Sequence, residues 1–170
     1  MLAVVLFASA VHELGHYLIL RACGAAVAGV RINIFGAVME VAGGRLSYGQ
    51  ETAAVLAGPA ANLLCALIMA AFGGSRWAVP AGANLVLCVF NLLPVRPLDG
   101  GRALELIISW AAGPAAGERA ARYIGSCTAL ALAGGVVFVI RSSGGSLWLL
   151  PAAVGLLGAA AGELVGKGRF

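Results

Sequence analysis

Two histidines and a glutamate stand close together near the start of the chain, in His12-Glu13-Leu14-Gly15-His16. Residues i and i+4 of a helix lie one turn apart on the same face, so both imidazoles can reach one metal ion. Glu13, next to the first histidine, can take a proton from water without being a ligand itself. The pattern predicts a zinc site that activates water.

Two histidines leave a hydrolytic zinc site incomplete, because such sites usually have three protein ligands and one open position. Asp99 is the chain's one aspartate. Pro94 and Pro97 keep the backbone before it out of helix, and Gly100 lets the chain pack tightly after it. An aspartate at a helix start can instead be an N-cap. Because the histidine pair lacks a third ligand, we expect Asp99 to bind the metal.

The surroundings of the motif argue against a chance match. His12 and His16 are the chain's two histidines, and both lie in an apolar stretch. A charged group at mid-membrane costs about 2.5 to 3.5 kcal/mol on insertion scales. A helix rises about 1.5 Å per residue, which places His12 ~13 Å from Arg21. The predicted site therefore lies below the membrane surface but within reach of water.

The composition indicates a membrane protein. Apolar residues make up 61% of the 170 residues and charged residues 11%, whereas soluble domains average about 25% charged residues. The net charge is +4, but the basic residues are scattered singly, which argues against nucleic acid as a partner. The four cysteines form no CxxC pair, so they are expected to act as small hydrophobic residues.

The sequence predicts an all-α, multi-pass (polytopic) membrane protein with about five transmembrane helices and one small β-hairpin at the membrane surface. The third helix is short for an upright crossing and ends before Pro94, so its end is expected to line a cavity or be buried in protein. The apolar stretches are 2–20, 53–72, 79–93, 123–140 and 147–164.

The basic residues in the loops predict the orientation. The positive-inside rule places the side with nine positive charges, and with it the C-terminus, in the cytoplasm. The N-terminus would then lie outside with no flanking charge, so we expect a sixth helix before it in the full-length protein. A signal peptide is the alternative, but no cleavage site fits. The nine residues are Arg21, Arg31, Arg45, Arg96, Arg102, Arg119, Arg122, Lys167 and Arg169, against Arg76 and Arg141 on the other side.

Two segments between the apolar stretches have other patterns. Residues 30–41 alternate with the two-residue period of a strand, and Gly36 is a natural turn point, which predicts the hairpin. The segment 100–122 predicts short interfacial helices, because Pro114 suits a helix start and Glu118 and Arg122 share a polar face.

Taken together, HELGH, the later NLLPVRPLDGG and the segment from Ala57 to Asn62 resemble the site-2 protease family of intramembrane zinc metalloproteases, most closely its bacterial sporulation stage IV branch. The resemblance implies one zinc ion bound by His12, His16 and Asp99, with Glu13 as the general base. It implies an integral protein of the bacterial cell membrane that cuts membrane-tethered protein substrates near the cytoplasmic face, a sigma-factor precursor in the sporulation branch.

A length of 170 residues is typical of a single domain, so we expect one transmembrane metalloprotease domain over 1–170, with a catalytic core in about 1–110 and a C-terminal helical pair in about 123–165. The resemblance covers roughly residues 1–105. The helix expected before HELGH, a PDZ-like insertion and a nucleotide-sensing domain are not seen in the sequence, which leaves substrate selection and regulation by other membrane proteins open.

Three further residues are candidates for holding the substrate. The strand with Phe35 offers edge hydrogen bonds to an extended peptide. Asn62 is a candidate for bonding the backbone of an unwound substrate, with a helix–helix hydrogen bond as the alternative. Asn91 has the same candidate role, or it satisfies the helix break before Pro94.

Two other classes of function are alternatives to a protease. A metal transporter also places ionisable groups at broken helices, but a transport site does not need Glu13 beside its ligands. A non-catalytic scaffold has no use for a complete set of zinc-site residues.

Overall fold

A computed structural model describes residues 1–33, 36–42, 46–142 and 158, with only the backbone over most of 26–42. The chain forms two compact units, Met1–Leu93 and Pro94–Phe170, and each is described by itself. Phe35 lies outside the described residues, and so does all of the stretch 147–164 apart from residue 158. The single domain over 1–170 and the second helix of the C-terminal pair therefore stay predictions.

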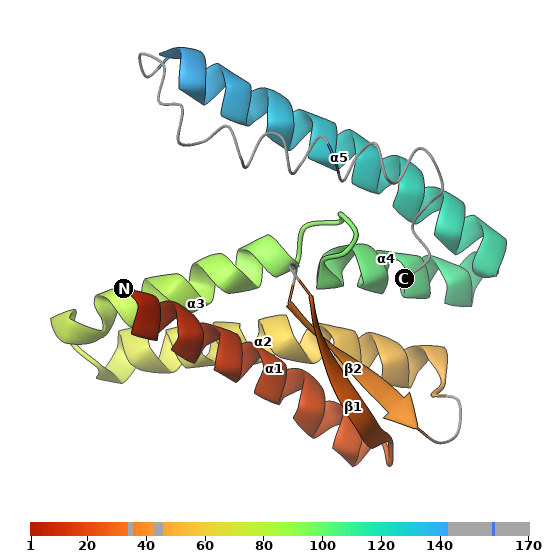
Figure 1. Ribbon diagram of the computed structural model, residues 1–170, viewed down its shortest axis with the longest axis horizontal. Coiled ribbons are helices and arrows are strands. Elements are labelled where there is room, and N and C mark those ends of the chain that lie inside the picture. Colours follow the sequence, from red (N-terminus) through yellow and green to blue (C-terminus); the bar gives the residue numbers. More distant parts are fainter. Residues whose placement is uncertain (34–35, 43–45, 143–157, 159–170) are drawn as a thin grey trace. The chain divides into compact units, whose positions relative to one another are not determined.

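The first unit contains three α-helices that pack side by side and a two-stranded sheet (Figure 1). Helix α2 contacts both α1 and α3, and the two strands pair with each other. The elements are α1 (Leu2–Ala22), β1 (Ala26–Asn33), β2 (Gly36–Ala42), α2 (Tyr48–Phe72), the 3-10 helix η1 (Ser75–Trp77) and α3 (Ala78–Asn91).

Local sequence signals set the ends of α1 and α2. Gly24 has a φ of 79°, a left-handed conformation that glycine adopts without strain. The Gly24 amide donates to the Arg21 carbonyl and the Ala25 amide to the Leu20 carbonyl, the two bonds of a Schellman motif that ends α1. Helix α2 begins with a capping box, in which Ser47 and Gln50 bond each other's backbone amides.

The strands β1 and β2 are antiparallel, with Ala26 opposite Ala42 and Asn33 opposite Gly36. The register shifts between Val27 and Gly29, the position of a bulge or irregularity. A location of this pair at the membrane surface stays a prediction.

Helix α3 ends at Asn91, so the predicted break before Pro94 is confirmed. Its 14 residues span about 21 Å at 1.5 Å per residue, less than the ~30 Å hydrocarbon core of a bilayer.

The second unit begins with a loop and continues into α4 (Asp99–Ala112) and α5 (Pro114–Ser142), which pack on each other. Pro114 starts a helix, as predicted. The predicted short interfacial helix before residue 123 is wrong in extent, because the helix from Pro114 runs on to Ser142. After Pro114 no proline interrupts it, and the ion pair between Glu118 and Arg122, one turn apart at 3.1 Å, stabilises its continuation.

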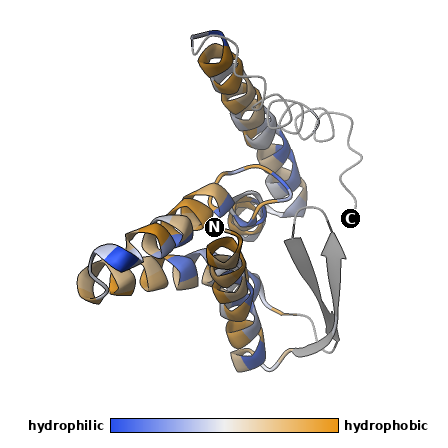
Figure 2. Ribbon diagram, turned by 60° about the vertical axis from the view of Figure 1, so that its left-hand side comes forward, coloured by the Kyte–Doolittle hydropathy of each residue, from blue (hydrophilic) through white to orange (hydrophobic). Residues whose placement is uncertain are grey.

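Three helices of the described residues are long and apolar enough to cross a membrane, namely Leu2–Ala22, Tyr48–Phe72 and Pro114–Ser142. Hydrophobic residues dominate these helices (Figure 2), and many of their large hydrophobic side chains are exposed. The mostly helical architecture is therefore confirmed, and the count of five or six spans stays a prediction.

Helices α1 and α2 approach each other closely at Gly15. A Cβ atom there would lie 2.5 Å from the Ala57 carbonyl oxygen and 2.8 Å from the Ala61 Cβ. Both distances are too short for real contacts, so a side chain at this position would push the helices apart. The glycine between Glu13 and His16 therefore sets the spacing of the two helices.

We expect Gly15→Ala to lower the free energy of unfolding by about 1 to 3 kcal/mol, the usual cost of overpacking. Thermal unfolding in detergent measures this. The matched control is Gly82→Ala in α3, where an added Cβ meets nothing within 4 Å and helix propensity favours alanine by about 1 kcal/mol. Equal unfolding midpoints for the two variants would contradict the close approach.

Candidate metal centre

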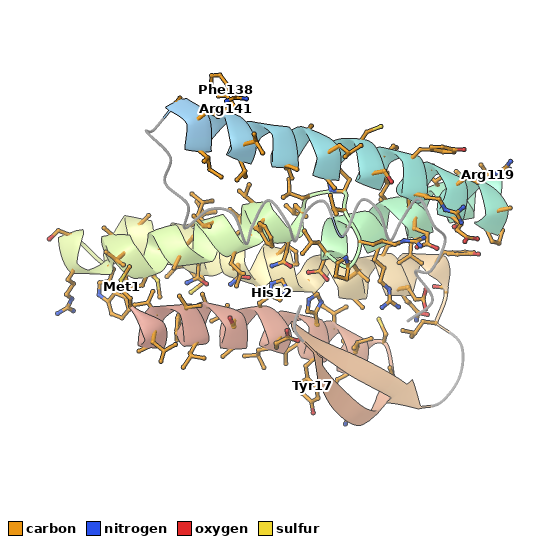
Figure 3. The ribbon with its side chains drawn as sticks, turned by 45° about the horizontal axis from the view of Figure 1, so that its top comes forward. Met1, His12, Tyr17, Arg119, Phe138 and Arg141 are labelled. Carbon is orange, nitrogen blue, oxygen red and sulfur yellow. The ribbon has the colours of Figure 1, made fainter. Side chains whose placement is uncertain are left out.

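His12 lies on the face of α1 that packs against α2. Its side chain is 7% exposed, and it points toward the neighbouring helices while Tyr17 points away on the other side of α1 (Figure 3). The His12 Nδ1 atom lies 2.7 Å from Asn62 Oδ1 on α2. A hydrogen bond to α2 thus fixes the orientation of this imidazole on the apolar helix α1.

The orientation of the Asn62 amide follows from its other partners. Its Nδ2 donates to the Ala8 carbonyl at 2.9 Å and to Asn84 Oδ1 at 2.8 Å. A backbone carbonyl only accepts, so the nitrogen must face Ala8 and the oxygen must face His12. His12 therefore carries its proton on Nδ1 and donates it to Asn62.

His16 is held one helical turn further along α1, by backbone. Its Nδ1 lies 2.8 Å from the Ala54 carbonyl oxygen, which only accepts, so Nδ1 is again the protonated nitrogen. The imidazole ring rests on Gly58, where an added Cβ would collide with its Nε2, Cε1 and Cδ2 atoms. The glycine of the Gly58-Pro59 pair thus makes room for the ring.

These bonds direct both Nε2 atoms at each other, 3.1 Å apart, with the rings nearly perpendicular at 83°. In neutral imidazoles with the protons on Nδ1, neither Nε2 has a proton to donate, so two lone pairs face each other. Zinc–nitrogen bonds of 2.0–2.1 Å in a tetrahedron place two ligand nitrogens about 3.3 Å apart. The pair of imidazoles therefore fits one zinc ion in both donor chemistry and spacing.

Glu13 follows His12 on α1 and is half-buried. A rotation of about 100° per residue places it beside the face that carries the histidines rather than on it. This position agrees with a group that acts on water next to the metal without being a ligand.

Asp99 belongs to the second unit and is the first residue of α4. The N-cap of α4 is Leu98, and no side chain makes the capping bond. The alternative prediction for Asp99, an N-cap, is therefore wrong. A carboxylate in the first turn is stabilised by the helix dipole, and its role as a ligand stays a proposal.

The loop before Asp99 is fixed to α4 by contacts within the second unit. Arg96 forms an ion pair with Glu105 at 2.6 Å, and the Leu98 amide donates to the Val95 carbonyl at 2.8 Å. A Cβ on Gly101 would lie 2.7–2.9 Å from backbone atoms of Val95 and Arg96, so this glycine permits the close packing. The start of α4 therefore has a defined geometry.

The three residues predicted to hold the substrate have different outcomes. Asn62 is fully buried and uses both Nδ2 protons and its Oδ1 inside the protein, which supports the alternative of a helix–helix hydrogen bond. Asn91 donates to the Leu87 carbonyl at 3.0 Å, a local bond at the end of α3. Sequence reasoning missed Asn84; an asparagine in the middle of an apolar stretch was the available signal.

Comparisons with known proteins give one family. The family model described as Peptidase family M50 matches residues 1–79 and 74–132. The Synechocystis sp. protein named "Putative zinc metalloprotease sll0528" is 37% identical over 116 residues, which cover 62% of this chain and 31% of that protein. The Mycobacterium tuberculosis protein named "Putative zinc metalloprotease Rip3" is 34% identical over 164 residues, 86% of this chain and 42% of that protein.

Among solved structures, the chain is similar to "Site-2 Protease from Methanocaldococcus jannaschii", with a TM-score of 0.67 and 23% identity over 95% of this chain and 76% of that one. At this identity the likeness concerns the fold. The chain spans less than half the length of the two curated relatives, 31% and 42%.

We expect Glu105→Gln to loosen the loop before Asp99, because it removes the charge that Arg96 pairs with. A partly exposed ion pair contributes roughly 1 kcal/mol at most, so hydrogen exchange at the Leu98 amide should accelerate up to about fivefold. The control is Glu118→Gln, which removes the exposed ion pair on α5. Equal exchange in both variants would show that the Arg96 pair does not hold the loop.

Proposed function

The chain belongs to peptidase family M50, and on that premise we propose that it is an intramembrane zinc metalloendopeptidase. In this proposal His12, His16 and Asp99 bind one zinc ion and Glu13 is the general base. One observation carries the proposal, the two Nε2 atoms 3.1 Å apart with both Nδ1 protons already donated elsewhere. Such a pair is stable when a cation lies between the lone pairs.

A zinc ion at this position supplies a Lewis acid that acidifies water and polarises a peptide carbonyl. The protein's own groups supply the rest. Glu13 accepts the proton of the attacking water and later gives it to the leaving amine. Asn62 and the Ala54 carbonyl accept the Nδ1 protons of the two imidazoles and so orient both Nε2 atoms toward the ion.

We also propose that the substrate is a membrane-tethered protein cut near the cytoplasmic face, as in regulated intramembrane proteolysis. The charge distribution of the loops supports this side and a cytoplasmic C-terminus. A helical substrate hides its carbonyls in its own hydrogen bonds, so it must unwind before Glu13 and the metal can act. Processing of a sigma-factor precursor rests on the sequence resemblance alone.

Glu13→Gln separates the protease from a metal transporter. We expect the variant to bind zinc as the parent does, because the three ligands remain, and to lose cleavage by about 100-fold or more, the usual contribution of a general base. The assay incubates full-length protein with candidate membrane substrates and reads the fragments by mass, with and without a zinc chelator. The matched control is Glu51→Gln at the start of α2. Metal flux by a parent that cleaves nothing would favour transport.

Asp99→Asn tests the third ligand. An amide oxygen binds zinc less well than a carboxylate, so we expect zinc affinity to fall by about 100-fold or more, at or above the upper end of the 10- to 100-fold typical for changes outside the ligand set. Competition with a chromophoric chelator in detergent measures it. His16→Ala serves as the positive reference, and an Asp99→Asn protein that binds zinc like the parent would remove Asp99 from the site.

A further inference from the structure

Two asparagines are buried completely in the apolar first unit. Asn62 on α2 and Asn84 on α3 are both 0% exposed. Burying an amide without hydrogen bonds costs roughly 1 to 3 kcal/mol in proteins, so side chains of this kind are expected to be fully bonded. The contacts between them and their neighbours connect α3 to a histidine on α1.

The hydrogen bonds run in one direction through three helices. His12 Nδ1 donates to Asn62 Oδ1 at 2.7 Å, and Asn62 Nδ2 donates to Asn84 Oδ1 at 2.8 Å. Asn84 Nδ2 then donates to the Pro80 carbonyl at 3.0 Å. Because that carbonyl can only accept, it fixes the Asn84 amide in the same way that the Ala8 carbonyl fixes Asn62.

We propose that Asn84 is a positioning residue for the metal site, acting through Asn62 to hold the His12 proton on Nδ1 and the His12 Nε2 lone pair toward the ion. This inference rests on the proposed function, because it assumes that His12 is a zinc ligand. It adds α3, which contributes no ligand, to the elements that set the chemistry of the site.

The reason is that the Asn62 amide has two orientations. If it turned over, its nitrogen would face His12 Nδ1, and the histidine would have to move its proton to Nε2, toward His16. That proton would occupy the place of the ion. Two acceptors oppose the turn, the Ala8 carbonyl and Asn84 Oδ1, so loss of Asn84 removes one of the two.

Asn84 also acts electronically. Hydrogen bonds in a chain polarise each other, so each donation strengthens the next. A better acceptor at Asn62 makes His12 a more basic ligand, as partners of metal-bound histidines generally do. The His16 Nδ1 donates to the Ala54 backbone carbonyl instead. A side-chain substitution can therefore change the acceptor of the His12 Nδ1 proton but not that of the His16 Nδ1 proton.

The experiment measures zinc affinity of the full chain in detergent by chelator competition, with the unfolding midpoint recorded alongside. Asn84→Leu removes the acceptor oxygen at similar size, and we expect zinc affinity to fall roughly three- to tenfold, below the 10- to 100-fold of a direct partner. Asn84→Asp keeps an acceptor oxygen, so we expect it to match or exceed the parent. Should Asn84→Leu fail to fold, weaker zinc binding by Asn84→Asp overturns the proposal.

The matched control is Cys88→Ala, which trims a side chain of 3% exposure one turn along the same helix. It should leave zinc affinity unchanged even where stability falls. In the Asn62→Leu background the connection to His12 is already cut, so Asn84→Leu should have no further effect on affinity. An equal loss in both backgrounds, or a loss with Cys88→Ala, means a packing role and overturns the proposal.

The same measurements separate this inference from the proposed function. A parent that binds zinc with no change in Asn84→Leu overturns the role of Asn84 alone. A parent that binds zinc but cleaves nothing contradicts the proposed protease function. The comparison of zinc affinities then still tests the positioning role of Asn84. A parent that binds no zinc overturns both.

Discussion

Two imidazole lone pairs are held against each other inside an apolar helix pair, and the arrangement of the first unit follows from that constraint. Each ring needs an oxygen acceptor for its Nδ1 proton, because the acceptor keeps the proton on Nδ1 and leaves Nε2 with its lone pair. Asn62 and the Ala54 carbonyl are those acceptors, and both come from α2. Helix α2 must therefore lie closely along α1, with its residues in antiparallel order opposite the motif.

The glycines of the two motifs make that approach sterically possible. Gly15 removes the side chain that would strike the Ala57 carbonyl, and Gly58 removes the one that would strike the His16 ring. Gly58 and Asn62 are four residues apart on α2, as His12 and His16 are on α1, so the two pairs meet across the helix contact. A polar site in an apolar span is thus stabilised by backbone proximity and by few, fully bonded side chains.

In the second unit, the start of α4 at Asp99 is likewise fixed by a few close contacts. The loop before the aspartate is held by its own helix, through the Arg96–Glu105 ion pair and the close packing at Gly101. Because Leu98 is the N-cap and no side chain makes a capping bond, the Asp99 carboxylate does not cap the start of α4. A residue at a helix start fixed in this way keeps a defined direction, which is what the proposed role of Asp99 as a metal ligand requires.

The sequence alone determined the membrane setting, the HELGH spacing, the break before Pro94 and the helix start at Pro114. Each depends on composition or on neighbours within one turn. It could not assign roles to Asn62 and Asn84. An asparagine in an apolar stretch has the same local pattern whether it bonds a substrate, a neighbouring helix or a histidine of the candidate metal site. Only the packing of α1, α2 and α3 decided that, since hydrogen bonds between residues 22 and 50 positions apart exist only once the helices lie together. The length of α5 was missed for a related reason, because the polar face that predicted an interfacial helix also fits the first turns of a long one.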